Sequence, residues 1–457
     1  MDVKGKRILV VGLGKSGVAA ALFLQARGAR VTVSDAKAED QLRQEIPALL
    51  DKGITVESGG HGERTFRDQD LIVVSPGVPY DHPQLQQARS FCIPVIGEVE
   101  LAFRFLKGRV LAITGSNGKT TTTALVGEIL AKSGKKTLVG GNIGTPVISL
   151  VSQSTPDSLV VLEISSFQLE TIQQFRPWIA AILNITPDHL DRHHTFQAYI
   201  DAKARMFENQ QADDFAVLNA DDPTCAALKT KVKGTLCWFS RKHAVECGAH
   251  LAGDQIAFRR DGREQNVLGR NDVQLKGAHN LENVLAAVTM AMLAGCEPEK
   301  IRKAVSEFRA VEHRLELVTT VNGVAFYNDS KATNVDATVK ALESFPGKVH
   351  IILGGKDKGS DYTVLNPLLR ERAHGAYLIG AAAEKIGSQI QGSTPLVRSG
   401  TLERAVRQAF EAAAPGDIVL LAPACASFDQ FENYEHRGRV FKELVVSLTP
   451  VTLGDRA

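Results

Sequence analysis

Two glycine-rich loops, each set between a short apolar run and a helix-length stretch, constrain the fold of this chain most. The first, Gly12–Gly17 (GLGKSG), follows the apolar run Arg7–Val11. The second, Gly115–Thr120 (GSNGKT), follows Arg109–Thr114. A strand that passes through such a loop into a helix builds a phosphate site, because free N–H groups at the helix start face the anion. The sequence therefore predicts two nucleotide-type sites in two different segments.

The rest of the chain repeats this strand–helix alternation. Runs rich in Val, Ile and Leu, without polar alternation, are typical of strands that are buried on both faces of a parallel sheet. At roughly 100–200 residues per domain, 457 residues predict several domains. We predict an α/β protein of three domains: a Rossmann-like domain over 1–98, a central P-loop ATPase-type domain with a parallel sheet over 99–310, and a Rossmann-like domain over 311–457. The polar stretch 238–275 is expected to be a small β excursion of the central domain.

Charge and cysteine usage exclude several classes of protein. Lys plus Arg is 53 and Asp plus Glu is 51, so the net charge is only +2, which disfavours a nucleic-acid partner. The six cysteines are scattered and form no C-x-x-C pair, so we expect reduced thiols and neither disulfides nor a zinc site. No apolar run reaches the roughly 18 residues of a membrane helix. These observations predict a cytoplasmic protein without membrane insertion.

The first loop has the G-x-G-x-x-G spacing, and Asp35 closes the next strand at the distance of a ribose-binding acid. Another loop, Ser75–Pro79, also follows an apolar strand, at the edge where open sheets bind ligands. A nicotinamide dehydrogenase is one interpretation, although this geometry holds any nucleoside diphosphate. A tight strand–helix turn without a ligand is the alternative.

The second loop is a shortened phosphate loop, G-x-x-G-K-T, because Ile113 stands where the full pattern has glycine. Backbone N–H groups would cradle phosphates, Lys119 would neutralise charge, and the Thr120 hydroxyl would bind Mg²⁺. Glu163 closes a buried strand, as a Walker-B acid does. Hydride transfer needs no such loop, so this loop weakens the dehydrogenase interpretation.

Two further features are ambiguous from the residues alone. The stretch 184–193 lies just past a strand and carries His189 among Asp and Asn residues that suit Mg²⁺ or phosphate, although a lone histidine is more often structural. Lys203 lies on a helical stretch and is interpreted, on residue type alone, as a solvated surface lysine.

Taken together, the motifs resemble the Mur ligases of peptidoglycan synthesis, which are three-domain, ATP-dependent amide-bond ligases. The resemblance runs in order along nearly the whole chain. It rests on the loop 114–120, on Asn142 in GGNIG, on His189 in PDHLD, on Lys203, and on the runs AHNLEN (278–283), EHR (312–314) and YNDSKATN (327–334).

Within the family, three runs resemble the members that add D-glutamate: EISSFQLE (163–170), GGKDKG (354–359) and APACASFDQF (422–431), with YEHRG (434–438) continuing the last one. The resemblance implies ligation of D-glutamate to UDP-N-acetylmuramoyl-L-alanine through an acyl phosphate, by a protein that acts as a monomer. Alternatives are another Mur ligase, a folylpolyglutamate-type ligase, a non-catalytic nucleotide-binding protein and, more remotely, the NAD-dependent dehydrogenase.

The resemblance also implies ligands for each residue set. Catalytic roles fall to Lys119, His189, Lys203 and Arg314. The ATP set is Gly115, Ser116, Asn117, Gly118, Lys119, Thr120, Thr121, Asn280, Asn283, Arg314, Asp329 and Lys331. The UDP-substrate set is Gly12, Gly14, Lys15, Ser16, Asp35, Lys37, Ser75, Gly77, Asn142, Ser165, Gln168 and His189. The D-glutamate set is Thr333, Lys358, Ser427, Phe428 and Tyr434. Two Mg²⁺ ions are expected on Thr120, Glu163, His189 and Lys203, the last carrying a carbamate derived from carbon dioxide.

Overall fold

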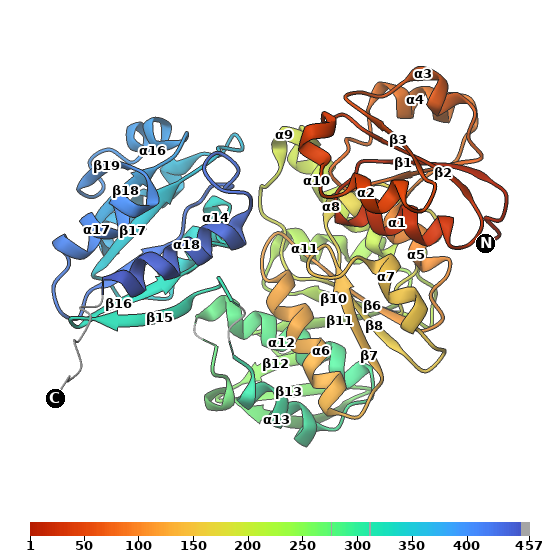
Figure 1. Cartoon of the computed structure of the whole chain (residues 1–457). Coiled ribbons are helices and arrows are strands. Elements are labelled where there is room, and N and C mark those ends of the chain that lie inside the picture. The colour runs from red at the N-terminus through yellow and green to blue at the C-terminus, as the bar shows by residue number, and fades with distance from the viewer. Residues whose placement is uncertain (276, 310–311, 449–457) are drawn as a thin grey trace, which may run out of the picture. The chain divides into compact units, whose positions relative to one another are not determined.

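A computed structural model describes residues 1–275, 277–309 and 312–448, which form three β-sheets (Figure 1). These residues divide into two compact units. The first unit comprises Met1–Ile185, Gln197–Val273 and Glu282–Glu307. The second comprises Thr186–Phe196, Gln274–Leu281 and the chain from Phe308 onward. No helix of the described residues is long and apolar enough to cross a membrane.

The N-terminal sheet has five strands, all parallel, in the order β3-β2-β1-β4-β5. The central strands β1 and β4 are buried almost throughout, which explains their continuous apolar sequences. The strands are β1 (Arg7–Val11), β2 (Arg30–Asp35), β3 (Thr55–Ser58), β4 (Leu71–Val74) and β5 (Val95–Gly97). The helices are α1 (Lys15–Gln25), α2 (Ile46–Leu50), α3 (Glu63–Arg67), α4 (Pro83–Ser90) and α5 (Glu98–Phe103).

The central sheet has nine strands in the order β14-β13-β12-β11-β10-β9-β6-β8-β7. The strands are β6 (Arg109–Thr114), β7 (Thr137–Gly141), β8 (Leu159–Glu163), β9 (Ile179–Ile182), β10 (Phe215–Asn219), β11 (Thr235–Ser240), β12 (Gly248–Ala252), β13 (Gln255–Arg260) and β14 (Arg263–Gly269). The helices are α6 (Lys119–Lys132), α7 (Val147–Leu150), α8 (Ser166–Leu169), α10 (Phe196–Ala204), α11 (Pro223–Ala227), α12 (Ala278–Leu293) and α13 (Pro298–Glu307). Helix α9 (Leu190–His193) lies in the second unit.

One edge of this sheet is antiparallel, which corrects the expectation of a parallel central sheet. Strands β12, β13 and β14 pair antiparallel because two-residue turns join them, and a parallel return needs a much longer crossover. Asp261 and Gly262 both have positive φ, 53° and 72°, as a type I′ hairpin turn requires. The polar stretch is therefore the expected β excursion, and it extends the sheet.

A disulfide between Cys237 of β11 and Cys247 corrects the expectation that all six cysteines are free thiols. Strand β11 pairs with β12 so that Trp238 lies opposite Gly248, and this register sets the two preceding cysteines side by side. Their Cα atoms are 4.7 Å apart, within the range of a disulfide. Residues ten positions apart in sequence thus meet through strand pairing that their spacing does not reveal.

The C-terminal sheet has six strands in the order β15-β16-β20-β17-β18-β19, parallel except for the hairpin β15–β16. Two apolar cores cover its faces, one packed by α14, α15 and α16 and the other by α17 and α18. The strands are β15 (Glu316–Val321), β16 (Val324–Asn328), β17 (Val349–Gly354), β18 (Ala373–Ile379), β19 (Leu396–Gly400) and β20 (Ile418–Leu421). The helices are α14 (Val335–Glu343), α15 (Asn366–Arg372), α16 (Ala383–Gln389), α17 (Leu402–Ala412) and α18 (Tyr434–Ser447).

The predicted class, α/β with three layered sheets, is confirmed. Inside the first unit, the buried side chain of Glu98 in α5 joins the N-terminal and central parts. Its Oε1 accepts a 2.6 Å hydrogen bond from the backbone N–H of Ile148 in α7. Burial raises the pKa of Glu98 to about 7.

Candidate functional site

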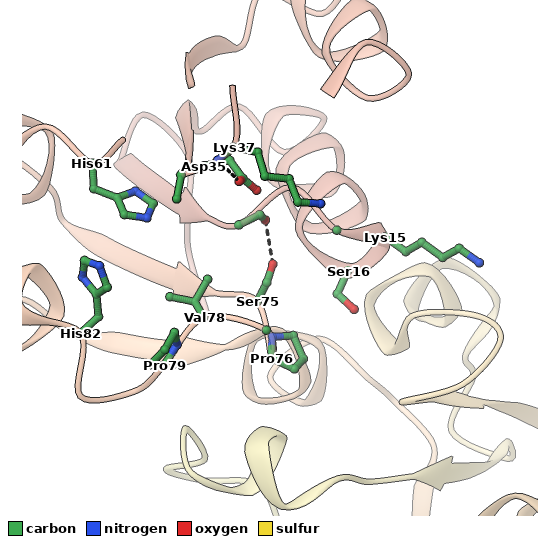
Figure 2. Close-up of a pocket in the computed structure, with 14 residues that line it drawn as sticks. Lys15, Ser16, Asp35, Lys37, His61, Ser75, Pro76, Val78, Pro79 and His82 are labelled. Atoms are coloured by element: carbon green, nitrogen blue, oxygen red, sulfur yellow. Dashed lines mark hydrogen bonds between the residues drawn. The ribbon is translucent and has the colours of Figure 1, made fainter. Parts of the chain in front are cut away.

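A cavity of about 480 Å³ lies at the carboxyl ends of β1, β2 and β4 (Figure 2). Eight residues of the expected UDP-substrate set line it: Gly12, Gly14, Lys15, Ser16, Asp35, Lys37, Ser75 and Gly77. From β1 the chain adds β2 and β3 on one side of the sheet and then β4 and β5 on the other. Open α/β sheets bind ligands at such a topological switch point. Eight of the residues expected at the UDP end therefore lie together around one cavity.

The glycine loop at this pocket is held by two side chains from other strands. Gly12 has φ 90°, and the Ser75 hydroxyl donates a 2.7 Å hydrogen bond to its carbonyl oxygen. Asp35 Oδ2 accepts a 2.6 Å bond from the Leu13 N–H, and its Oδ1 accepts one of 2.8 Å from the Lys37 N–H. A side chain at Gly17 would collide with the Gly12 carbonyl, so α1 can approach the loop only with glycine there.

Two histidines that the sequence did not single out also line the cavity. The His61 and His82 rings meet edge-to-face, with centroids 5.1 Å apart, and His61 Nδ1 lies 2.8 Å from the Ser34 hydroxyl. Figure 2 shows the two rings together at one end, with Lys15 and Ser16 at the other. Burial, and then the charge of His82, lower the pKa of His61. Both histidines come from irregular loops, where no periodic pattern marks a functional residue.

The phosphate loop lies between β6 and α6 in the first unit. Gly118 has φ 85°, and a Cβ there would collide with the Asn283 side-chain oxygen, so this position requires glycine. The Lys119 ammonium folds back onto the loop and donates to the carbonyl oxygens of Gly115 and Ser116, at 2.8 and 2.9 Å. The loop is therefore compact, and the Lys119 ammonium, the cation that was expected to neutralise phosphate charge, is bound to the loop's own carbonyl oxygens.

Residues from distant segments brace the loop. Asn184 Oδ1 accepts a 2.8 Å hydrogen bond from the Asn117 N–H, and its Nδ2 donates to the Asn117 carbonyl at 3.1 Å. The Ser116 and Tyr199 hydroxyls are 3.1 Å apart. Asn184 begins the stretch 184–193 that was expected to suit Mg²⁺ or phosphate, although it was in no predicted residue set. Tyr199 was not predicted, because a supporting contact 83 residues away leaves no local signal.

Three oxygen-bearing side chains meet beside the loop. The Thr120 hydroxyl donates a 2.7 Å hydrogen bond to Glu163 Oε2 at the end of β8. The Asn142 amide donates to Glu163 Oε1 at 3.2 Å. Hydroxyl and carboxylate oxygens are hard donors of the kind that Mg²⁺ prefers, so Thr120 and Glu163 fit Mg²⁺. Thr120 and Glu163, predicted as metal partners from their places in the sequence, do lie together.

Lys203 lies in the same region, and its interpretation as a surface lysine is wrong. Its side chain is buried, and Nζ donates to the Gly115 carbonyl at 2.9 Å and to the Thr114 hydroxyl at 3.3 Å. The ammonium also lies 4.6 Å from the ring centroid of Tyr199. A buried lysine is expensive unless it is paired, so its presence beside a phosphate loop indicates a role at that loop.

Other members of the expected UDP-substrate set do not line the cavity. Ser165 and Gln168 form a capping box at the start of α8, directly after Glu163. Gln168 Oε1 accepts from the Ser165 N–H at 2.9 Å, whereas its buried Nε2 has no hydrogen-bond partner among the described residues. Asn142 contacts Glu163, as noted above. These residues lie on the strand β8 side of the phosphate loop.

His189, the fourth expected metal residue, belongs to the second unit. There it follows Asp188, a residue absent from the predicted set. Asp188 Oδ2 accepts a 2.9 Å bond from the Asn334 amide and lies 3.6 Å from His189 Nε2. Asp188 Oδ1 lies 3.4 Å from the ammonium of Lys358. Asp188 thus pairs with the lysine that was expected to bind D-glutamate.

The expected D-glutamate residues follow the carboxyl ends of three neighbouring strands of the C-terminal sheet: Thr333 after β16, Lys358 after β17 and Ser427 after β20. Parallel strands place these loops at one edge. The backbones of Lys356 and Ala426 exchange two hydrogen bonds of 2.8 and 3.1 Å, which ties the second loop to the third. Ser427 is buried, whereas Phe428 is 66% exposed.

A fully buried arginine of α18 ties the first loop to the third. Arg437 donates from Nε to the Ser330 hydroxyl at 3.0 Å and from Nη2 to the Ser330 carbonyl at 2.8 Å. Nη1 and Nη2 both donate to the Cys425 carbonyl at 3.2 Å. We refer to this set, Arg437 with Ser330 and Cys425, as the arginine clamp. Sequence reasoning missed it, because nothing local distinguishes Arg437 from a surface arginine.

Two further expected ATP residues, Asp329 and Lys331, lie on the loop after β16, and Arg314 lies just before β15. Asp329 is buried, which raises its pKa to about 6, although the charge of Arg314 opposes the shift. Arg314 Nε is itself buried and has no hydrogen-bond partner among the described residues. Lys331 approaches Tyr434, with Nζ 3.3 Å from its hydroxyl. A buried, unpartnered guanidinium nitrogen is unusual and suits an anionic ligand.

Comparisons with known proteins cover most of the chain. Three family models match in order: the Mur ligase MurD-like N-terminal domain over residues 6–97, the Mur ligase middle domain over 113–291, and the Mur ligase glutamate ligase domain over 313–425. These ranges follow the three sheets described above.

Several curated proteins are similar over nearly their full length. A protein of Koribacter versatilis named UDP-N-acetylmuramoylalanine–D-glutamate ligase is 66% identical, over 97% of this chain and 98% of its own. Proteins with the same name from Acidobacterium capsulatum and Solibacter usitatus are 60% and 54% identical, each over 98% of this chain and over 97% and 100% of their own.

Solved structures show the same fold at low identity. The UDP-N-acetylmuramate–alanine ligase of Thermotoga maritima aligns with a TM-score of 0.61 and 20% identity, over 97% of this chain and 99% of its own. A pseudomurein peptide ligase of Methanothermus fervidus aligns with the same TM-score and identity, over 97% of this chain and 100% of its own. These likenesses concern the fold alone.

Proposed function

The chain belongs to the Mur ligase family, and from this premise we propose that it ligates D-glutamate to UDP-N-acetylmuramoyl-L-alanine with conversion of ATP to ADP and phosphate. Relatives at 54–66% identity with this name support the choice of substrates. The contact between Thr120 and Glu163 beside the phosphate loop is the single observation that carries the chemistry, because it provides an oxygen site for Mg²⁺ where ATP phosphates bind.

The reaction needs ATP because a carboxylate is a poor electrophile. The substrate carboxylate oxygen attacks the γ-phosphorus, and the bond from that phosphorus to ADP breaks. The D-glutamate amine then attacks the carbonyl carbon of the acyl phosphate. The tetrahedral intermediate expels phosphate, the amine loses a proton, and an amide remains.

Approach of one anion to another requires cations along the path. Lys119, which lies on the loop carbonyls, is placed to neutralise phosphate charge. Arg314 carries a buried nitrogen without a partner among the described residues, and we assign it to the γ-phosphate side. Thr120 and Glu163 would hold Mg²⁺, which would supply neutralisation of phosphate charge. The second expected ion is assigned to His189.

We propose that Lys203 carries a carbamate. Its burial supports this assignment, because a carbamate offers oxygen donors in a place where an ammonium would repel Mg²⁺. The contacts of Nζ with Gly115 and Thr114 support it too, since they hold the side-chain end beside the loop.

The remaining ligands are assigned by the elements that present them. Asn280, Asn283, Asp329 and Lys331 would contact the nucleoside and phosphates of ATP, with the other loop residues from Gly115 to Thr121. The cavity at Gly12–Gly17 would hold the UDP end of the acceptor, while Asn142, Ser165 and Gln168 would contact it nearer the reacting end. The unpartnered Nε2 of Gln168 supports this last assignment. Thr333, Lys358, Ser427, Phe428 and Tyr434 would bind D-glutamate.

We place the reaction in the cytoplasm, where ATP and UDP-sugars are made, and propose a monomer. The domain bounds 1–98, 99–310 and 311–457 remain a proposal, and the last boundary falls on residues 310–311, outside the described residues.

An amino-acid screen of ADP formation tests the proposal. With UDP-N-acetylmuramoyl-L-alanine as acceptor, D-glutamate should support turnover, whereas L-glutamate, L-alanine and diaminopimelate should not. Turnover with another amino acid would indicate a different Mur ligase, and turnover with a folate acceptor would indicate the folylpolyglutamate-type reaction. NAD reduction without ADP formation would overturn the assignment altogether.

A further inference from the structure

A cluster of two histidines and an aspartate lies at the start of three neighbouring strands of the C-terminal sheet, at the edge opposite the D-glutamate loops. His350 is the second residue of β17, His374 is the second residue of β18, and Asp417 directly precedes β20. One ligand atom from each lies within 4.8 Å of the others. The function proposed above uses none of these residues.

We propose that this cluster is a binding site for a divalent transition-metal ion of the Zn²⁺ type. Zn²⁺ binds histidine nitrogens and carboxylate oxygens at about 2.0–2.2 Å, so neighbouring ligand atoms of a tetrahedral site lie about 3.4 Å apart. Asp417 Oδ2 lies 3.2 Å from His350 Nε2 and 3.6 Å from His374 Nδ1. Two edges of the tetrahedron thus exist already, and an ion could enter without rearrangement of the backbone.

A β-bulge lies at His374, near the start of β18. In the register of β17 with β18, Val349 pairs with Ala373 and His350 pairs with Gly375, so His374 is the extra residue. Regular pairing continued from Val349 and Ala373 would set His374 opposite His350, with both side chains on one face of the sheet. The bulge takes His374 out of that pairing, yet its Nδ1 stays 3.6 Å from Asp417 Oδ2, and bulges are frequent next to functional sites.

The neighbouring groups are those that support a metal ligand. The other ring nitrogen of His350, Nδ1, lies 3.0 Å from the Tyr377 hydroxyl, which fixes the ring orientation. Gly375 leaves room for the Tyr377 ring, which a Cβ there would contact at 3.3–3.5 Å. Asp417 Oδ2 also accepts a 3.0 Å hydrogen bond from the Ala414 N–H. Each of the two buried ligands therefore has an outer partner.

The cluster is open to solvent on one side, so an ion could reach it. His350 and Asp417 are buried, whereas the side chain of His374 is 52% exposed. Three protein ligands with one side open to water leave a fourth position for a water molecule or another small ligand. The nitrogen donors favour Zn²⁺-type ions over Mg²⁺, which prefers oxygen. A bound ion would clamp β20, β17 and β18 together at their starts.

The test uses the full chain, stripped of metal and titrated with Zn²⁺, with Co²⁺ as a spectroscopic probe. We expect one Zn²⁺ per chain at this site, a rise in melting temperature, and visible d–d bands of tetrahedral Co²⁺. His374→Ala and Asp417→Asn should abolish these bands and weaken Zn²⁺ binding by more than the roughly 10–100-fold that loss of an outer partner causes. His243→Ala, which removes an exposed histidine of the central part, is the matched control and should change neither.

His374 is exposed, so its variant should fold, and circular dichroism together with unchanged ligase turnover would verify this. The proposal is overturned if the wild type binds no Zn²⁺, or if His374→Ala binds Zn²⁺ and Co²⁺ as the wild type does. The proposal does not depend on the ligase assignment, because metal binding is measured without substrates.

Discussion

The ammonium of Lys203 donates a 2.9 Å hydrogen bond to the carbonyl oxygen of Gly115. A buried side chain of α10 is thus joined to the first residue of the phosphate loop. This contact links a lysine whose sequence context suggests a surface position to the most recognisable motif in the chain.

Replacement of this lysine should nearly abolish turnover. We expect Lys203→Ala to lower kcat by roughly 10²–10³-fold, the range seen when one preorganised charge-stabilising group is lost. Steady-state ADP formation measures the effect. Lys229→Ala, an exposed lysine of the same part of the chain, is the control and should retain wild-type activity.

A carbamate role makes a further prediction for the same variant. Acetate or propionate at high concentration should partly restore turnover to Lys203→Ala, since a free carboxylate can take the place of the missing oxygen donors. Full activity of Lys203→Ala without any additive would refute the role.

The contact between Thr120 and Glu163 predicts a change in Mg²⁺ dependence. Thr120→Val keeps the shape of the side chain and removes its hydroxyl, so half-maximal activity should need about tenfold more Mg²⁺, equivalent to about 1.4 kcal/mol. Titration of activity with Mg²⁺ measures this. Thr120→Ser retains the hydroxyl and should resemble the wild type. Equal Mg²⁺ requirements in the wild type and Thr120→Val would contradict the assignment.

Lys358 and Lys356 lie on one loop, so variants of each can distinguish a specific contact with D-glutamate from an effect of the loop's net charge. Lys358→Ala should raise the KM for D-glutamate about 10–100-fold, as expected for the loss of a hydrogen bond to a charged group, and should leave the KM for ATP near its wild-type value. Lys356→Ala, two residues earlier, is the matched control. Similar rises in both variants would show that the loop acts only through its net charge.

Glu98 predicts how stability changes with pH. Its pKa is about 7 in the folded chain, compared with 4.5 for an ordinary glutamate, so the folded state binds the proton more tightly than the unfolded state does. The resulting stabilisation is fully present below pH 4.5 and is lost as pH rises through 7. The difference of about 2.5 pH units corresponds to about 3 kcal/mol.

Glu98→Gln removes this titration while keeping an oxygen that can accept the bond from the Ile148 N–H. Urea unfolding at pH 5 and pH 8 should therefore show the variant gaining stability relative to the wild type at the higher pH. A difference between the two proteins that stays constant with pH would contradict the raised pKa.

The sequence predicted those parts of the fold and site that depend on local chemistry. The glycine loops were expected between a strand and a helix, and both lie there, because tight turns before helices restrict the residues that can occupy them. Glu163 was predicted as a metal partner because it closes an apolar strand, and it does contact Thr120. The three α/β sheets followed from apolar runs that alternate with helical stretches.

Features that depend on distant contacts could not be predicted in this way. The burial of Lys203 depends on packing against Tyr199 and on the loop after β6. The disulfide of Cys237 with Cys247 depends on strand register. The edge-to-face contact of the His61 and His82 rings depends on how two irregular loops meet. No spacing rule encodes these relationships.

The arginine clamp has a genetic consequence. Tyr434–Ser447 is the final helix of the described chain, and Arg437 within it holds Ser330 and Cys425 in two loops about one hundred residues apart from each other. A nonsense mutation that stopped translation just before Tyr434 would leave the nucleotide loops and every strand encoded, yet the gene product would lack the guanidinium that joins those two loops. Such an allele should behave as a null, although fewer than a tenth of these 457 residues would be missing.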